Sequence, residues 1–201
     1  MRQIWKPKPG EPEVLEVREA QDPEPQPGEV RERVRASGIN IADILARMGL
    51  YPDAPPLPAV VGYEVAGVVD GVGDGVEGFS DGDRVLVFTR FGGYSDVVCA
   101  PAAFVAPIPE ELDFGGAASI PVNWLTAWLM LVRLGNVREG DKVLVHACAG
   151  GVGTAAVQIC RQRGAEVIGT ASASKHDRLR EMGVAECIDY RNQDFEAEVR
   201  R

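Results

Sequence analysis

Residues 146–158, HACAGGVGTAAVQ, place three glycines between an apolar run and a helix-like segment. In a dinucleotide-binding βαβ unit, one such glycine makes the tight turn, one lets the backbone approach the pyrophosphate, and one lets the helix pack on the strand. The pyrophosphate then binds free N–H groups at the helix N-terminus. We therefore expect Gly150, Gly151, Val152 and Gly153 to bind a nucleotide, with a simple strand-to-helix turn as the alternative.

The segments around this loop alternate between strand and helix patterns. Strands alternating with helices make βαβ units and a parallel sheet that is buried on both faces. A helix that begins in the tail QDFEAEVRR would follow the last strand. The predicted elements are a turn and strand over 139–148, a helix over 151–164, a strand over 165–171, a charged helix over 175–183 and a strand over 185–190.

The first half of the chain reads as β-structure. Short strand candidates separated by Gly, Pro and Asp predict a small barrel or sandwich. One helix, 41–49, interrupts them and ends at Gly49, and the acidic, Pro-rich segment 21–29 reads as a loop. The strand candidates are 14–20, 28–38, 60–73, 83–88 and 94–100.

The composition excludes several classes of function. A net charge of -9 and a pI near 4.8 argue against a protein that binds nucleic acid or anionic membranes, which need a basic face. The four cysteines form no C-x-x-C pair and there are two histidines, so no zinc site is expected. The N-terminus has no apolar region typical of a secretory signal, and a reduced, cytoplasmic protein is the simplest interpretation.

Residues 117–132, AASIPVNWLTAWLMLV, are strongly apolar and resemble a membrane span. The run is shorter than the roughly 20 residues that a span needs, and it contains Pro121 and Asn123. We therefore predict no membrane span here, but a buried helix from near Val122 to near Gly135.

The second strand of the βαβ unit indicates which dinucleotide is bound. An NAD site carries Asp or Glu at the end of this strand to bind the ribose hydroxyls. Here the strand ends in Gly169-Thr170-Ala171-Ser172, followed by Ser174, Lys175 and His176. Hydroxyls and a cation suit a 2′-phosphate, so NADP(H) is favoured as cofactor. Alternatively, Ser174 only caps the next helix and Lys175 is solvated.

Several motifs in the order found here resemble one family. ASGINIADILARMGLY, PAVVGYEVAGVV, GDRVLVF, the AGGVG loop, GTASASKH and IDYR are similar to the quinone oxidoreductase branch of the medium-chain dehydrogenase/reductase superfamily. Within it, the zeta-crystallin-like and VAT-like members match best. The resemblance implies an α/β plus β fold, in which a GroES-like barrel precedes the first half of a Rossmann doubly wound parallel sheet. The domains expected are an incomplete GroES-like catalytic domain, 1–121, and the N-terminal half of a Rossmann NADP-binding domain, 122–201.

The resemblance also implies zinc-independent, NADPH-dependent hydride transfer to quinones or activated alkenes (enones). Zinc-dependent relatives place Cys near Ser37–Asn40 and His in a Gly-His-Glu triplet, whereas this chain has Gly62-Tyr63-Glu64. The full-length form is expected to be a homodimer. Two alternatives are an enoyl reductase module and a non-catalytic nucleotide-binding protein of the same fold.

The family motifs carry site roles onto particular residues. Asn40 would lie beside the nicotinamide and its ribose, Tyr51 would line the substrate pocket, and Thr126 would contact the nicotinamide. Lys175 and Tyr190 would hold the adenosine phosphate, with Ser172 beside them. Leu45 stands where some bacterial members have a second pocket tyrosine.

Each of these residues also has a plainer interpretation. Asn40 could instead cap the helix that follows it. Tyr51 and Tyr63 could be packing residues, and Glu64 a structural charge.

A complete Rossmann sheet has two βαβαβ halves, and these residues supply one. Residues 1–201 alone are therefore expected to be poorly active or prone to aggregation unless a partner covers the open sheet.

Overall fold

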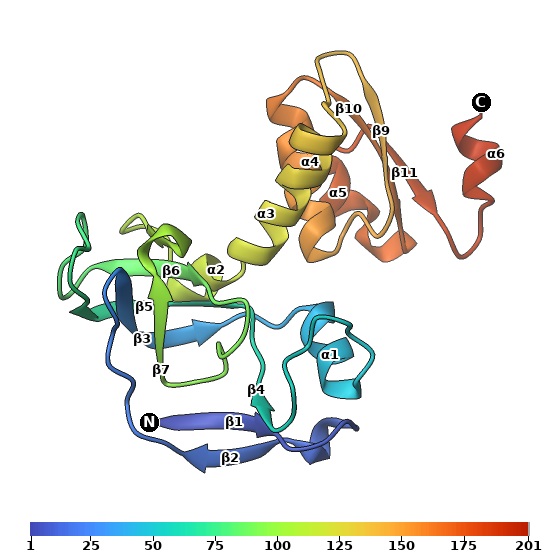
Figure 1. The fold of residues 1–201 in the computed structure, drawn as a ribbon. Helices are drawn as coiled ribbons and strands as arrows, with labels where there is room; N and C mark the ends of the chain where they lie inside the picture. The colour runs from blue at the N-terminus through green and yellow to red at the C-terminus, as the bar shows by residue number, and fades with distance from the viewer. Residues whose placement is uncertain (201) are drawn as a thin grey trace. The chain divides into compact units, whose positions relative to one another are not determined.

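The computed structural model describes residues 1–200, which form two compact units, Met1–Val122 and Asn123–Arg201 (Figure 1). The first unit is built mainly from β-strands, and the second alternates strands with helices. The Rossmann-type alternation and the preceding antiparallel β-structure confirm the predicted fold class.

The first unit is organised around a curled antiparallel sheet of five strands in the order β7-β3-β5-β6-β8. Valines from neighbouring strands, among them Val30, Val65 and Val85, fill its interior. Alternating valines suit a pleated, half-buried surface, which is why this pattern was readable from the sequence. The strands are β3 (Glu29–Ser37), β5 (Glu64–Val72), β6 (Arg84–Phe88), β7 (Val97–Pro101) and β8 (Val105–Pro107).

A second, three-stranded sheet has the order β2-β1-β4. Its strands are β1 (Arg2–Lys6), β2 (Glu16–Glu19) and β4 (Ala59–Val60). The sequence patterns did not predict β1, because its five residues lie next to the Pro- and Gly-rich segment 7–12 and show little hydrophobic alternation. Its pairing with β2 and β4 is a tertiary contact.

The predicted strand 60–73 is divided in two. Gly62 has a φ of 107° and Tyr63 follows it, so the chain bends between β4 and β5. A Cβ at Gly62 would lie 2.6 Å from the backbone nitrogen of Tyr94. Only glycine fits this bend, for reasons of both backbone angle and space.

Helices and short helical turns connect the strands of the first unit. Helix α1 (Ile41–Met48) ends at Gly49 as predicted, with a φ of 78° there. Helix α2 (Phe114–Ala118) was not predicted; Asp113 caps it by accepting a hydrogen bond from the Gly116 amide at 2.7 Å. Short 3-10 turns are η1 (Pro12–Val14) and η2 (Ala102–Phe104).

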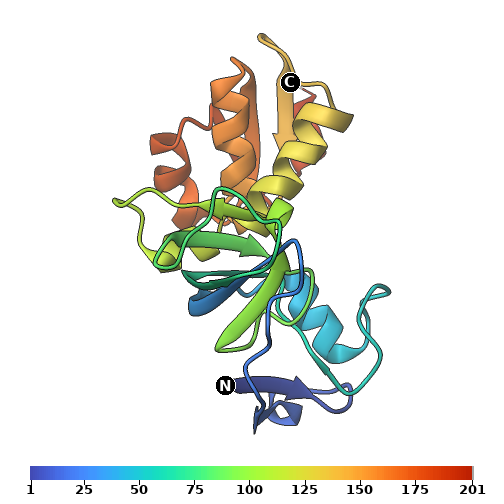
Figure 2. The same cartoon turned by 60° about the vertical axis from the view of Figure 1, so that its left-hand side comes forward.

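The second unit is a parallel sheet of three strands, in the order β11-β10-β9. Helices α4 and α5 pack on one side of it, and α6 lies on the other (Figures 1 and 2). The strands are β9 (Lys142–Val145), β10 (Glu166–Ala171) and β11 (Glu186–Asp189). The helices are α4 (Gly151–Gln162), α5 (His176–Glu181), preceded by the 3-10 turn η4 (Ala173–Lys175), and α6 (Phe195–Val199). The predicted tail helix ends at Val199, and Arg201 lies outside the described residues.

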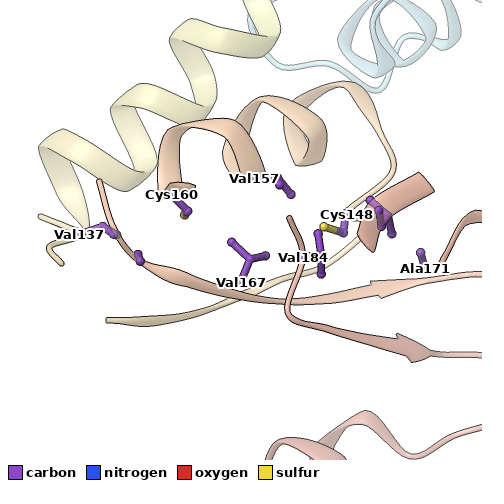
Figure 3. Close-up of a cluster of buried hydrophobic side chains, with 9 residues drawn as sticks. Val137, Cys148, Val157, Cys160, Val167, Ala171 and Val184 are labelled. Carbon is purple, nitrogen blue, oxygen red and sulfur yellow. The ribbon is translucent and has the colours of Figure 1, made fainter. Parts of the chain in front are cut away.

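Small and β-branched side chains form the core beneath α4 (Figure 3). Cys148 and Cys160 are fully buried there beside Val157 and Val167. Cys148 also fills the space over Gly169, where a Cβ would come within 2.7 Å of its sulfur. The helix therefore lies close to the strands, which fixes the position of the glycine loop at its start.

The helix predicted near Val122 to Gly135 exists as α3 (Pro121–Trp128) and a π-helical continuation, η3 (Leu129–Leu134). The prediction that it is buried is wrong for much of its length, because Met130 is 56% exposed and Leu134 is 76% exposed. Hydropathy reports that a side chain is apolar, not that another segment covers it. Among residues 1–200, no helix is long and apolar enough to cross a membrane.

Candidate functional site

The glycine loop joins β9 to α4 and leaves no room for side chains. Gly150 is the N-cap residue of α4. A Cβ on Gly153 would lie 2.5 Å from the Ala147 carbonyl oxygen and 2.6 Å from that of Cys148. Both contacts are backbone atoms that cannot move aside, so glycine is required for the helix to start this close to the strand.

Gly151 meets a different neighbour. A Cβ there would lie 2.4 Å from Oδ1 of Asn123 in α3. Val152 packs against the buried cluster that includes Ala127, Ala155 and Ile159. Its side chain therefore anchors the loop in the core, while Gly150 and Gly151 are exposed.

The first turn of α4 presents unpaired backbone donors. The Thr154 amide makes the first intrahelical hydrogen bond, to the Gly150 carbonyl at 2.8 Å. The preceding amides, of Gly151, Val152 and Gly153, have no carbonyl one turn earlier to bind. Such amides and the positive end of the helix dipole together favour an anion such as a diphosphate.

A pocket of about 470 Å³ lies beside the loop, at the carboxyl ends of β9, β10 and β11. It brings together Ser172, Lys175 and Tyr190, the three predicted residues of the adenosine phosphate site. Aspartate and glutamate are absent from its lining. The lining residues are His146, Ala147, Ala149, Thr170, Ala171, Ser172, Lys175, Tyr190 and Phe195.

The other residues of the predicted phosphate segment have structural positions. Ser174 does not cap α5, because Lys175 occupies the N-cap position and no side chain caps there. The predicted cap by Ser174 is therefore wrong, whereas the other part of that alternative, that Lys175 is solvated, agrees with its exposed side chain. His176 is buried, and its Nε2 lies 3.2 Å from the Ala171 carbonyl oxygen. Lys175 is exposed beside the pocket, where its ammonium group is free to meet a ligand.

In the first unit, Asn40 occupies the N-cap position of α1 and forms a capping box with Asp43. Its Nδ2 also donates to Oε1 of Glu64 at 2.8 Å. Asp43 supplies the other local contact by accepting from the Asn40 amide at 2.8 Å and from the Gly62 amide at 3.0 Å. The sequence analysis raised Asn40 as a helix cap but did not name its partner Asp43, three residues later in the chain.

Glu64 is almost fully buried and holds two segments at once. Its Oε2 accepts from the Val122 amide at 2.8 Å while its Oε1 binds Asn40. Burial raises the pKa of this carboxyl, and the two hydrogen bonds oppose that rise. Glu64 was expected to be a structural charge; the geometry shows that it also orients the Asn40 amide.

Tyr51 belongs to an aromatic cluster. Its ring meets Tyr63 edge-to-face with centroids 5.9 Å apart, and Tyr63 lies 5.0 Å from Phe91. Burial raises the pKa of the Tyr63 hydroxyl, and neighbouring Tyr51 raises it further. Thr126 is half-buried on α3 in the second unit, whereas Asn40, Leu45 and Tyr51 belong to the first.

Two family models match the chain. The alcohol dehydrogenase GroES-like domain matches residues 26–110, and a family described as zinc-binding dehydrogenase matches residues 151–201. The rat synaptic vesicle membrane protein VAT-1 homolog is 48% identical over 93% of this chain and 46% of its own length. The chain belongs to the quinone oxidoreductase branch of the medium-chain dehydrogenase/reductase superfamily. It spans about half the length of the curated relatives that it matches.

Solved structures of this superfamily share the fold. Escherichia coli quinone oxidoreductase, determined in complex with NADPH, matches with a TM-score of 0.92 and 35% identity, over 100% of this chain and 62% of that one. A structure described as an NAD-dependent alcohol dehydrogenase matches with a TM-score of 0.91 and 39% identity, over 100% and 67%. One of these two neighbours was thus determined with NADPH, and the other is described as NAD-dependent.

One matching family is described as zinc-binding. Within residues 1–200, no group of three or more His, Cys, Asp or Glu side chains is placed to hold a metal ion. A nicotinamide dinucleotide does fit, because side chains at Gly151 and Gly153 would clash with their neighbours and the first turn of α4 offers its amides to a diphosphate.

Proposed function

We propose that this chain is part of a zinc-independent, NADPH-dependent reductase that transfers a hydride to quinones or activated alkenes. One observation carries the proposal: a glycine-rich loop with free amides lies next to a pocket lined by Lys175 and, among residues 1–200, by no carboxylate. The amides suit the diphosphate of a dinucleotide, and the ammonium group suits an additional phosphate.

The end of β10 supports NADP(H) over NAD. A carboxylate there would accept hydrogen bonds from the two ribose hydroxyls of NAD and repel a 2′-phosphate. Ser172 and Lys175 follow β10 instead. Asp189 ends β11, but its oxygens accept from Asn192 at 2.6 Å and from the Arg191 amide at 3.2 Å, and it does not line the pocket. We therefore assign Ser172, Lys175 and Tyr190 to the 2′-phosphate.

The reduced nicotinamide supplies a hydride when the cofactor is bound. The chain's own residues position the reactants and handle the proton. The side chain of Asn40, which is held by Glu64 and by the capping box with Asp43, would contact the nicotinamide ribose. Thr126 would contact the nicotinamide, and the hydroxyl of Tyr51 would donate the proton that follows the hydride. Solvent water is the other proton source.

We also propose a substrate class and an oligomeric state, which rest on the reaction and cofactor proposed above. The substrate is a small quinone or enone, and the full-length protein is a homodimer. The charge of -9 gives no basis for a nucleic-acid partner. An enoyl reductase module or a nucleotide-binding protein without turnover are the alternatives that the experiment must separate.

A titration with NADPH and NADH tests the cofactor assignment. Binding is followed by the fluorescence of the reduced nicotinamide. We expect the parent to bind NADPH more tightly than NADH. Lys175→Gln should lower the affinity for NADPH by about tenfold and leave the affinity for NADH unchanged. Lys142→Gln, which removes an exposed ammonium paired with Glu166, is the matched control. A preference for NADH, or equal loss in both variants, would refute the assignment.

The reaction class is tested by measuring turnover of the full-length protein. Oxidation of NADPH with a simple quinone supports the proposal. Saturation of an enoyl thioester without quinone reduction favours an enoyl reductase, and tight NADPH binding without turnover on either acceptor favours a binding protein.

A further inference from the structure

The hydroxyl of Thr170 connects two strand ends at the pocket. Thr170 lies one residue before the end of β10 and is 3% exposed. Its Oγ1 accepts from the Ala147 amide at 3.3 Å and lies 3.3 Å from Nδ1 of His146. Its backbone oxygen also accepts from the Cys148 amide at 3.0 Å. Thr170 therefore contacts all three residues, His146, Ala147 and Cys148, that lead from β9 into the glycine loop.

The contact between Thr170 and His146 allows the histidine to be an Nε2–H donor. A threonine hydroxyl has one proton to donate and two lone pairs. The Ala147 amide uses one lone pair of Oγ1, and the hydroxyl proton is available to Nδ1 of His146. A neutral imidazole that accepts at Nδ1 carries its own proton at Nε2.

The ring of His146 is also held from another side. Phe195 of α6 meets it edge-to-face, with centroids 4.9 Å apart and planes at 87°. His146 lines the same pocket as Ser172, Lys175 and Tyr190. A polar side chain whose ring contacts Thr170 on one side and Phe195 on another is suited to bind a ligand at little cost in conformational entropy.

We propose that His146 binds the nucleotide directly, by donating from Nε2 to a phosphate oxygen, and that Thr170 is the positioning residue for this donor. The inference rests on the nucleotide site proposed above and adds a ligand on the β9 side of the pocket. The phosphate is either the 2′-phosphate or the diphosphate, since both would border the pocket and the loop.

Two pairs of variants separate hydrogen bonding from packing. His146→Leu removes both ring nitrogens, whereas His146→Gln keeps an N–H at a similar reach. Thr170→Val keeps the shape and removes the hydroxyl, whereas Thr170→Ser keeps the hydroxyl. We expect His146→Leu and Thr170→Val each to lower the affinity for NADPH by about tenfold. The affinities of His146→Gln and Thr170→Ser for NADPH should stay within about threefold of that of the parent. Gln158→Leu, on the exposed side of α4, is the control.

The arms of the titration identify the phosphate. Loss of affinity for NADPH alone assigns Nε2 to the 2′-phosphate, and equal loss for NADPH and NADH assigns it to the diphosphate. The double variant His146→Leu/Thr170→Val should bind no worse than the weaker single variant, because both changes remove the same contact. If the parent binds NADPH and His146→Leu binds it equally well, the inference is wrong while the proposed function stands. If the parent binds neither nucleotide, the proposed function fails as well.

A second readout does not require the nucleotide. Nitrogen-15 NMR of the free protein distinguishes protonated from unprotonated imidazole nitrogens. We expect the His146 ring to carry its proton on Nε2 in the parent and in Thr170→Ser, and to become a mixture of tautomers in Thr170→Val. A proton on Nδ1 in the parent would overturn the role given to Thr170. Thermal denaturation of each variant shows that the fold is retained.

Discussion

The side-chain amide of Asn40 lies 2.8 Å from Oε1 of Glu64, a carboxylate that is almost fully buried. The other oxygen of Glu64 accepts from the Val122 amide at 2.8 Å. The Glu64 carboxylate therefore fixes both the side chain of Asn40, a candidate cofactor ligand, and the start of α3. Removing this carboxylate tests how strongly its two hydrogen bonds stabilise the first unit.

We expect Glu64→Ala to lower the free energy of unfolding by about 2 to 4 kcal/mol, because it leaves two buried N–H groups without acceptors and opens a cavity. Glu64→Gln should lower the free energy of unfolding by less, since one acceptor oxygen remains and Asn40 can turn its amide to match. Urea denaturation of the three proteins measures this. Equal stability of the Ala variant and the parent would contradict the link.

Glu32 predicts a pH dependence of stability. Its carboxyl is fully buried on β3 without a hydrogen-bond partner, and burial raises its pKa to about 8. The folded state therefore holds a proton that the unfolded chain has lost, and stability must fall as pH rises from the unfolded pKa near 4.5 toward 8. The expected loss between pH 5 and pH 8 is about 3 kcal/mol.

Two variants check that Glu32 is the cause. Glu32→Gln should remove most of this pH dependence, and Glu32→Leu should in addition raise stability at pH 8 by removing an unpartnered polar group. Glu29→Gln, at a half-buried position on the same strand, should leave the pH profile as it is. Denaturant midpoints measured between pH 5 and pH 9 give the answer, and an unchanged profile in Glu32→Gln would assign the effect to another group.

Gly153→Ala should disrupt the nucleotide loop. The added methyl group would come within 2.6 Å of two backbone carbonyl oxygens, of Ala147 and Cys148, so α4 must move away from the strand. We expect at least a tenfold loss of NADPH affinity and a lower melting temperature. Gln158→Ala, on the exposed side of the same helix, should change neither. Wild-type affinity in the Gly153 variant would show that the loop does not bind the diphosphate.

The thiols of the second unit should resist alkylation in the folded protein. Burial raises the pKa of Cys148 to about 11, so almost no thiolate is present at pH 8, and Cys160 is equally buried. Mass spectrometry after iodoacetamide treatment should find both unmodified until denaturant is added. Half-buried Cys187 is the internal comparison and should react first. Rapid native labelling of Cys148 would show that the core under α4 opens easily.

The sequence by itself determined the elements whose signal is local. Glycine spacing after an apolar strand located the loop at Gly150–153, hydrophobic alternation located most strands, and Gly49 marked the end of α1. These features depend on neighbours a few residues away, which a sequence pattern records directly. The family motifs likewise identified Lys175 and Tyr190, which the structure brings into one pocket.

Tertiary structure decided the rest, because those features depend on residues far apart in the chain. Strand β1 becomes a strand only by pairing with β2 and β4. Helix α3 is as apolar as a buried helix, yet its exposure depends on what packs against it. The role proposed for His146 was not visible in the sequence either, since it depends on contacts with Thr170 and Phe195, 24 and 49 positions later in the chain.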